Sequence, residues 1–431
     1  MEFINYQESV PLRYDVDVAV IGGGIAGVSA ACAAAHEGAR VLLVEYFATT
    51  GGNATIGGVA NWSGETRGQG AIFDEIIAMQ EAWGAIDPYL GEYEHFALSS
   101  NRIFEHSILE IILQKLLQRH KVHTLLHTCF VGARMDGNRI EEVVIRGNSG
   151  PEAVRAKVFI DCTGEAHVAR SAGFATSRGR DGDGMPLPAS LMFFVREMMD
   201  GKPVPQLPDG WFKPVKHKDD LPMTSIWPHG SQAKALKVKI PGYDSTDTEE
   251  MTRMEMRARE RMHEVLDYYQ RVEKKPWRFD HCSPRIGLRE GRRIIGDYVL
   301  TLDDIRAGTA FEDGVARGVF YLDGMTPDCE KRTYIIPKEE QGVPPYHIPL
   351  RSLIARDGVN LLMAGRCFSA DQLTLSSARV MPTCSMMGQA VGIWAAQSAD
   401  QHCAPREVEA KYVTTKLVQY GANLEVGAHA I

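Results

Sequence analysis

The feature that most constrains this chain is a strand, a glycine-rich turn, a helix and a second strand within its first 45 residues. Residues 16–21 (VDVAVI) are almost wholly apolar and predict a buried parallel strand. The turn after it has the spacing G-x-G-x-x-G, at Gly22, Gly24 and Gly27, and the second strand ends at Glu45. With all four pieces in register, we expect a dinucleotide-binding unit.

Each of these residues has a mechanical role in such a unit. Gly22 makes the tight turn, Gly24 lets the backbone approach a pyrophosphate, and Gly27 allows helix and strand to pack closely. Glu45 can accept the ribose hydroxyls and would repel a 2′-phosphate, which disfavours NADP and leaves NAD and FAD. The second glycine-rich turn at residues 49–58 (TTGGNATIGG) favours FAD.

Composition narrows the class of protein. A chain of 431 residues, 44% apolar and 24% charged, predicts two or three globular domains. The net charge of −8 disfavours a general nucleic-acid binder. The eight cysteines form no C-x-x-C pair, and the N-terminus lacks a secretory pattern, so we expect reduced thiols in a cytoplasmic protein. The uncharged run 18–35 could suggest a membrane helix, but its glycines and β-branched start favour strand, turn and helix, so no membrane association is expected.

The centre of the chain predicts further elements of such a domain. An amphipathic helix is expected over residues 104–117, and a turn at Asp136-Gly137-Asn138 predicts a hairpin. Strands are expected over residues 122–126, 130–135, 140–145 and 153–160, which form a meander. A helix is expected over about 247–272, and its methionine-rich face predicts packing rather than a binding site.

Five stretches together resemble the FAD-dependent oxidoreductases of the glutathione-reductase-like superfamily, in their broad and mostly uncharacterised branch. Residues 186–280 match no pattern that we can interpret. The matching stretches are DVDVAVIGGGIAGVSAA with VLLVE, GGNATIGG, VFIDCTGEAHVARSAG, PRIGLREGRRIIGDYVLT, and YHIPLRSLIARDGVNLLMAGRCFSADQLTLSSARVMPTCSMMGQAVG.

The resemblance implies an α/β fold: a Rossmann-type FAD-binding domain with a β-meander insert, and a second, mixed α+β domain that covers the flavin and binds substrate, here called the lid domain. We expect the FAD-binding domain over residues 1–185 and 346–405, the lid domain over 186–345, and a C-terminal extension over 406–431.

The resemblance also implies a set of cofactor-binding residues. The helix that begins near Pro382 would direct its first N–H groups at the flavin pyrimidine ring and favour electron uptake. The expected FAD-binding residues are Gly22, Gly24, Ile25, Ala26, Gly27, Glu45, Tyr46, Gly51, Gly52, Asn53, Thr55, Phe130, Thr163, Gly164, Gly365, Arg366, Pro382, Thr383 and Cys384.

Four residues are candidates for catalysis. Arg379 precedes the C-terminal helix and could hold a carboxylate or the flavin, or form a structural ion pair. Arg289 is the member of the cluster Arg285, Arg289, Arg292 and Arg293 that we expect to face substrate, while the other three bridge the lobes or lie in solvent. His347 is a possible proton acceptor. Gln372 stands where related sequences often have a histidine, which leaves the identity of the acid or base open.

Two other constellations predict no site. Cys367 and Cys384 lack the close spacing of a reductase disulfide. His120, His123 and His127 lie in a strand-like segment, so no metal site is expected.

The sequence thus predicts an FAD-dependent oxidoreductase that dehydrogenates or reduces a small polar organic molecule by hydride transfer to or from flavin N5. Two alternatives stay open: a flavin monooxygenase that uses NAD(P)H, and a non-redox nucleotide-binding scaffold or isomerase. The electron acceptor (oxygen, NAD(P) or another carrier) and the oligomeric state are not determined by the sequence.

Overall fold

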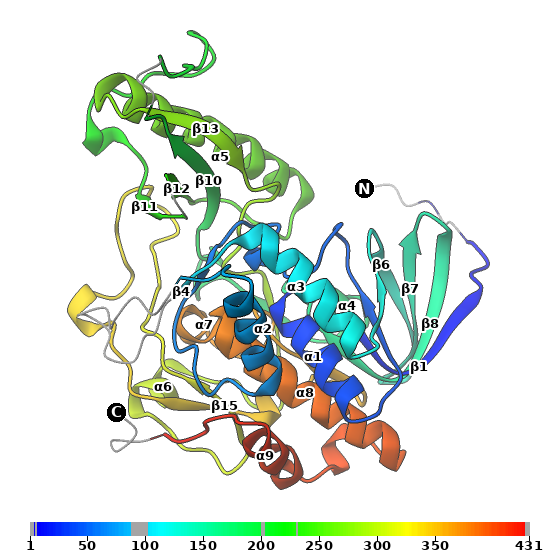
Figure 1. Ribbon diagram of the computed structural model, residues 1–431. Coiled ribbons are helices and arrows are strands. Elements are labelled where there is room, and N and C mark those ends of the chain that lie inside the picture. The colour runs from blue at the N-terminus through cyan, green and yellow to red at the C-terminus, as the bar shows by residue number, and fades with distance from the viewer. Residues whose placement is uncertain (1–3, 5–6, 88–101, 200–202, 230–231, 427–431) are drawn as a thin grey trace.

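The computed structural model describes residues 4 and 7–426, apart from 88–101, 200–202 and 230–231. Its largest sheet is assembled from both ends of the chain (Figure 1). Five strands of this sheet run parallel, because each pairs in parallel register with its neighbour. In spatial order they are β5 (His123–Leu125), β2 (Val41–Val44), β1 (Leu12–Ile21), β8 (Gly150–Asp161) and β17 (Leu361–Met363).

The long strand β8 also belongs to an antiparallel meander. Its first half pairs with β7 (Arg139–Gly147), which pairs with β6 (Cys129–Asp136). The predicted hairpin turn joins β6 to β7, with Gly137 at φ +57°. The predicted meander and the Rossmann-type fold class are therefore confirmed.

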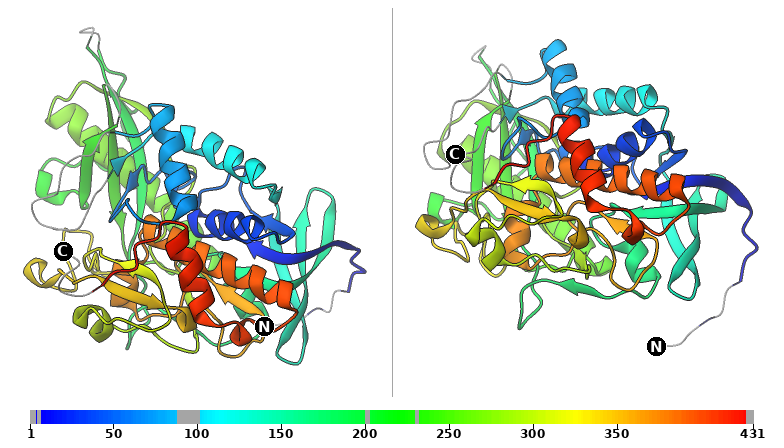
Figure 2. Two further views of the ribbon diagram at one scale, coloured as in Figure 1. Left: turned by 60° about the horizontal axis from the view of Figure 1, so that its bottom comes forward. Right: turned by 90° about the horizontal axis from the view of Figure 1, so that it is seen from below.

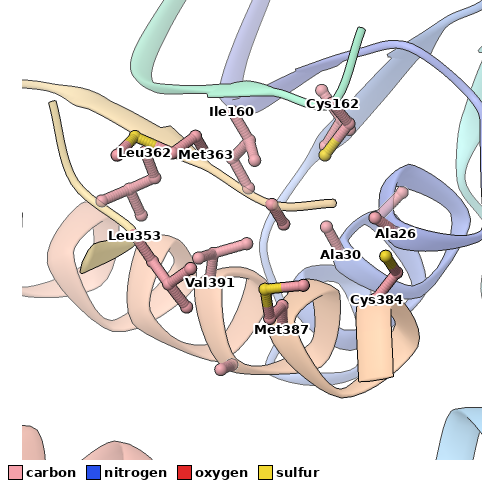
Figure 3. Packing of buried hydrophobic residues seen from close by; sticks show 14 of the residues in the cluster. Ala26, Ala30, Ile160, Cys162, Leu353, Leu362, Met363, Cys384, Met387 and Val391 are labelled. Carbon is pink, nitrogen blue, oxygen red and sulfur yellow. The ribbon is translucent and has the colours of Figure 1, made fainter. Parts of the chain in front are cut away.

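Helices α1 (Ile25–His36) and α8 (Met381–Gln401) pack against each other beside the parallel strands (Figures 1 and 3). A Cβ at Gly388 would overlap the carbonyl oxygen of Ala26, and one at Gly392 would overlap that of Ala30. The four-residue spacing of small residues in α8 therefore lets two helix backbones touch, with α1 near the start of the chain and α8 near its end.

The second sheet has four antiparallel strands and is called here the lid sheet. Helix α5 (Thr248–Asp267), followed by a π-helical turn at Tyr268–Val272, covers one face of it. Met254, Ala258 and Met262 of α5 are buried in that core, which confirms the predicted packing stripe. In spatial order the strands are β11 (Thr224–Pro228), β12 (Ala233–Ile240), β10 (Ala189–Glu197) and β13 (Trp277–Cys282).

The two faces of the lid sheet have different surroundings. Leu191, Phe193 and Val195 of β10 point into the core beneath α5, whereas Met192 and Phe194 point to the opposite side. On that side a Cβ at Gly58 would lie 3.2 Å from the Cβ of Met192. The second face of the lid sheet is thus turned toward the glycine-rich loop of the FAD-binding domain, and is called here the inner face.

Most of the remaining elements pack around α8 and the large sheet (Figure 2). Ile294, Leu300 and Leu322 pack in the large core rather than beneath α5, which favours a lid domain shorter than residues 186–345.

Within the described residues, no helix is both long and apolar enough to cross a membrane. The other helices are α2 (Ala71–Ala82), α3 (His106–Arg119), α4 (His167–Ser171), α6 (Leu302–Ala307), α7 (Gln372–Ala378) and α9 (Ala410–Gln419). The other strands are β3 (Asn61–Trp62), β4 (Arg102–Ile103), β9 (Thr176–Arg178), β14 (Arg292–Ile294), β15 (Gly314–Gly318) and β16 (Tyr346–Pro349).

A histidine cluster joins α3 to the lid sheet. His106 begins α3 and stacks on Phe194, with 4.9 Å between ring centroids. His229 and His281 lie 5.8 and 5.4 Å from His106. Burial and, to a smaller extent, the charges of the two neighbouring histidines together lower the pKa of His106 to about 4, against the opposing effect of Glu105. His106 is therefore neutral in the folded protein at pH values where it would be protonated in the unfolded chain.

We predict that Gly388→Ala and Gly392→Ala each destabilise the protein. The added methyl group must force the α1 and α8 backbones apart, and because it overlaps backbone oxygens that cannot rotate away, we expect a cost near the upper end of about 1–3 kcal/mol. This is larger than the gain of about 1 kcal/mol that alanine gives over glycine within a helix. The free energy of unfolding in urea measures the effect, with Gly342→Ala as control because a Cβ there meets nothing within 4 Å. Equal stability of all three variants would contradict the close contact.

We also predict that His106 makes the interface sensitive to acid. Because its pKa in the folded state is about 4 and its ordinary value is 6.5, the unfolded chain binds more protons between these values. Stability is therefore fully present above pH 6.5 and falls as pH drops toward 4, by at most roughly 3 kcal/mol. In His106→Phe, which keeps an aromatic ring against Phe194, the stability profile should be flatter in this window. His217→Phe, at an exposed histidine, should follow the wild type.

Candidate active site

The carboxyl ends of four parallel strands meet at one edge of the large sheet, called here the nucleotide edge. Ile21 of β1 is in register with Val44 of β2 and with Asp161 of β8, and Asp161 is in register with Met363 of β17. The segments that follow these strands are those predicted to bind the cofactor. In open α/β sheets, ligands bind outside the carboxyl ends of the strands.

The first glycine turn leaves space where a pyrophosphate is expected. Gly22 has φ +103°, and a Cβ on it would lie 2.5 Å from the carbonyl oxygen of Cys162. A Cβ on Gly27 would overlap the carbonyl oxygen of Gly22, so helix and strand are in contact there. At Gly24, by contrast, a Cβ would meet nothing within 4 Å. Gly24 caps α1 without a side-chain hydrogen bond, so the N–H groups of Ile25 and Ala26 in the first turn can receive an anion.

Glu45 is held at the end of β2 by backbone N–H groups. Its Oε2 accepts a hydrogen bond from Gly23 N at 2.6 Å, and its Oε1 accepts one from Phe47 N at 2.8 Å. Burial raises the pKa of Glu45, and these two hydrogen bonds act in the opposite direction. Tyr46, next to it, is 64% exposed. The backbone N–H of Thr128 binds the Glu45 carbonyl at 3.0 Å, which brings the start of β6, including Phe130, to the same edge.

The second glycine-rich loop packs on the first. The N–H of Gly51 donates to the carbonyl oxygen of Gly23 at 2.7 Å, and a Cβ on Gly52 would lie 3.2 Å from the Cα of Gly24. Asn53 and Thr55 make internal hydrogen bonds, Asn53 Nδ2 to the carbonyl oxygen of Leu288 at 2.8 Å and Thr55 Oγ1 to that of Thr50 at 2.7 Å. These contacts give both side chains a role in shaping the loop.

The turns after β8 and β17 interlock. Gly164 has φ +72°, and a Cβ on it would overlap the guanidinium of Arg366, so the side chain of Arg366 lies directly over this glycine. Gly365, also at positive φ, precedes that arginine. Arg366 Nη1 lies 3.3 Å from Glu165 Oε1, and burial raises the pKa of Glu165. Thr163 donates to Asp161 through its N–H and its hydroxyl, at 3.0 and 2.7 Å.

Helix α8 begins at Met381, one residue before the predicted Pro382. Val380 caps it without a side-chain hydrogen bond, and the N–H of Thr383 lies in the first turn. The Cys384 thiol donates to the carbonyl oxygen of Arg379 at 3.2 Å, and burial raises its pKa to about 12, so it is not a thiolate. Cys384 lies beside Ala26 of α1 (Figure 3). All eight cysteines are free thiols.

Arg285 is a residue of the nucleotide edge that sequence reasoning did not select. The carbon of its guanidinium lies 5.1 Å from the centre of the Phe47 ring. The guanidinium nitrogens make no ion pair or hydrogen bond with any described residue. Burial lowers its pKa, and so does the charge of Arg366, while Glu165, Glu255 and Glu45 act in the opposite direction. The contact with Phe47 joins two segments that are far apart in the sequence, which agrees with the expectation that this arginine bridges the lobes. The signal that could have selected it is its position at the start of the matching stretch PRIGLREGRR.

The structure brings Arg289 and Arg379 to one region. Buried Arg289 donates to the carbonyl oxygen of Pro188 at 2.6 Å and to Ser190 Oγ at 2.8 Å, which places it at the inner face of the lid sheet. Arg379 forms the ion pair that was one of its two predicted roles, with Asp323 at 2.9 Å. The charges of Arg379 and Asp323 shift the pKa of Arg289, which burial lowers to about 10.

His347 and Gln372 are engaged elsewhere. His347 Nε2 lies 2.6 Å from the carbonyl oxygen of Leu424, and its Nδ1 accepts from Phe311 N at 3.1 Å. Gln372 Nε2 donates to Glu290 Oε2 at 2.7 Å and to the carbonyl oxygen of Met185 at 2.9 Å. These contacts give His347 the role of anchoring the C-terminal segment and Gln372 that of holding the entry to the lid domain.

Two known proteins illustrate the similarity. Aklavinone 12-hydroxylase DnrF of Streptomyces peucetius is 44% identical over 71 residues, which are 16% of this chain and 14% of that protein. The fold is that of CabE, an aromatic hydroxylase from angucycline biosynthesis, with a TM-score of 0.53 and 14% identity. That alignment covers 94% of this chain and 66% of CabE. The chain thus spans less than two thirds of either protein's length.

Residues 17–417 match the family of FAD dependent oxidoreductases, and the chain belongs to this family. Its cofactor is FAD. The residues at the nucleotide edge fit that group, because the turn at Gly24 is open and the first N–H groups of α1 have no side-chain cap.

We predict that Arg285→Gln weakens FAD binding by about tenfold or more, since a charge-assisted hydrogen bond to a phosphate contributes roughly 1.5–3 kcal/mol. Titration of the apoprotein with FAD, followed by flavin fluorescence, measures the affinity. Arg292→Gln is the matched control, because Arg292 lies in the same segment but in β14, paired with β9. If Arg285→Gln bound FAD as tightly as the control, Arg285 would have no part in cofactor binding.

Proposed function

We propose that the protein exchanges a hydride between FAD and a small polar organic substrate that binds against the inner face of the lid sheet. The observation that carries the proposal is Arg289, a buried cation on this face that shares an electrostatic environment with Arg379, which precedes α8. Ser190, which binds Arg289, lies on the same face as the buried apolar side chains of Met192 and Phe194. A polar group of the substrate would therefore bind at Arg289 rather than along the apolar part of this face.

Bound FAD would supply the two-electron chemistry. The residues of the chain would bind and orient. The first N–H groups of α1 and the guanidinium of Arg285 would hold the pyrophosphate. The start of α8 near Thr383 would favour negative charge on the flavin ring placed beside that helix end. Arg289 and Arg379 would orient the substrate, with Asp323 fixing the position of Arg379.

A second candidate function is hydroxylation with NAD(P)H and oxygen. The names of the two similar proteins, both hydroxylases, favour it. In this case the inner face of the lid sheet would bind the molecule that is hydroxylated.

Anaerobic mixing of the purified protein with single reagents distinguishes these functions. We predict that a small polar organic donor bleaches the visible flavin spectrum without NAD(P)H, because hydride then passes directly from substrate to flavin. Bleaching by NAD(P)H alone, followed by oxygen uptake that an aromatic substrate accelerates, would instead establish the hydroxylase. A flavin that no donor and no NAD(P)H reduces would leave the non-redox scaffold or isomerase.

A further inference from the structure

Two lysines lie within an otherwise apolar strand of the lid sheet. Leu236 and Val238 of β12 are buried beneath α5, so the alternating residues Lys237 and Lys239 lie on the inner face. The strand register agrees: Lys237 stands opposite Met192, and Lys239 stands opposite Ser190, which binds Arg289. The inner face therefore carries a row of positive charge in the region where substrate is proposed to bind.

Lys237 has no counter-ion of its own. It is partly buried and makes no hydrogen bond or ion pair with any residue that the structure describes. Burial and, to a smaller extent, the positive charges of Arg289, Arg379 and Arg332 together lower the pKa of Lys237 to about 8, against the opposing effect of Asp323. Lys239 differs, because its Nζ donates to the carbonyl oxygen of Lys331 at 3.2 Å.

The carboxylate that faces this group is already engaged. Asp323 Oδ2 binds Arg379 Nη2 at 2.9 Å. The Nε of Arg379 is buried and has no partner among the described residues. Arg289 uses one terminal nitrogen for Pro188 and Ser190, both neutral acceptors. Besides the exposed Arg332, three cations that are buried or partly buried, Lys237, Arg289 and Arg379, thus share the one carboxylate of Asp323. Such an excess of positive charge is relieved by an anion.

We infer that Lys237, Arg289 and Arg379 form a subsite for an anionic group of the substrate, a carboxylate or a phosphate, with Lys237 as its unpaired charge. The inference rests on the proposed function, since it names the class of substrate for that same site. The two arginines present planar donors, and the lysine supplies a point charge that can follow the anion.

Calorimetric titration of the FAD-loaded protein tests the subsite directly, without turnover. The probes are malonate, inorganic phosphate and the uncharged analogue malonamide. We expect malonate or phosphate to bind and malonamide not to bind. The anion that binds more tightly shows whether the anionic group of the substrate is a carboxylate or a phosphate. Lys237→Met should weaken anion binding by at least about tenfold, the usual effect of losing a charged hydrogen-bond donor. Lys234→Met should leave anion binding unchanged. Lys234 precedes Ala235 on the same strand, and because odd-numbered positions such as Ala235 line the inner face, Lys234 lies on the opposite face.

A second measurement needs no variant. Because the pKa of Lys237 is about 8, its charge is present below that pH and lost above it. The affinity of the wild type for the anion should therefore fall as pH is raised through about 8. Anion binding that is absent, or that is equally tight in Lys237→Met and independent of pH in this range, would overturn the subsite.

The outcomes separate the inference from the function on which it rests. Anion binding that depends on Lys237 in a protein whose flavin no donor reduces would support the subsite and reject the hydride-transfer function. A flavin that neutral donors reduce, in a protein that binds neither anion, would support the function and reject the subsite.

Discussion

The contact between the α1 and α8 backbones is the constraint on which the rest of the structure depends. Gly388 and Gly392 lie against the carbonyl oxygens of Ala26 and Ala30, so no side chain separates the two helices. The hydroxyls of Ser29 and Ser385 add a hydrogen bond of 2.7 Å across the same interface. Because α1 begins at the first glycine turn and α8 begins after Arg379, this one contact brings the two helix N-termini to the same side of the sheet.

The lid domain is attached to the sheet and helices that this contact holds together. The chain leaves the large sheet after β8, builds the lid sheet, and returns through β17 and α8, so the lid sheet is tied to the FAD-binding domain at both of its ends. Gln372 holds the entry by binding both Met185 and Glu290. Glu290 in turn accepts from the backbone of Leu187 at 2.7 Å and pairs with Arg293. These buried hydrogen bonds and the ion pair link the entry segment to α7 and β14, and so favour one orientation of the inner face.

Sequence reasoning succeeded where structure is local in the chain. The turn at Gly22 to Gly27, the meander and the start of α8 could be predicted because each depends on residues a few positions apart. It was incomplete where a role depends on distant partners. The position of Lys237 on the inner face depends on which face of β12 packs on α5. The role of His347 depends on its contact with Leu424, 77 residues away. Even so, the alternation of lysines in KALKVKI was a readable signal, because polar residues two apart in a strand share a face.

One short segment connects the two halves of the site. Arg285 and Arg289 are four residues apart, yet the first lies over Phe47 at the nucleotide edge and the second binds Ser190 on the inner face. The charges around them differ: Glu45 and Glu165 act on Arg285, whereas Asp323, already bound to Arg379, acts on Arg289. A displacement of this segment would therefore change both positions together. Within the part of the chain that the structure describes, neither guanidinium has a carboxylate bound to it, so each arginine can bind an anion, Arg285 at the nucleotide edge and Arg289 on the inner face.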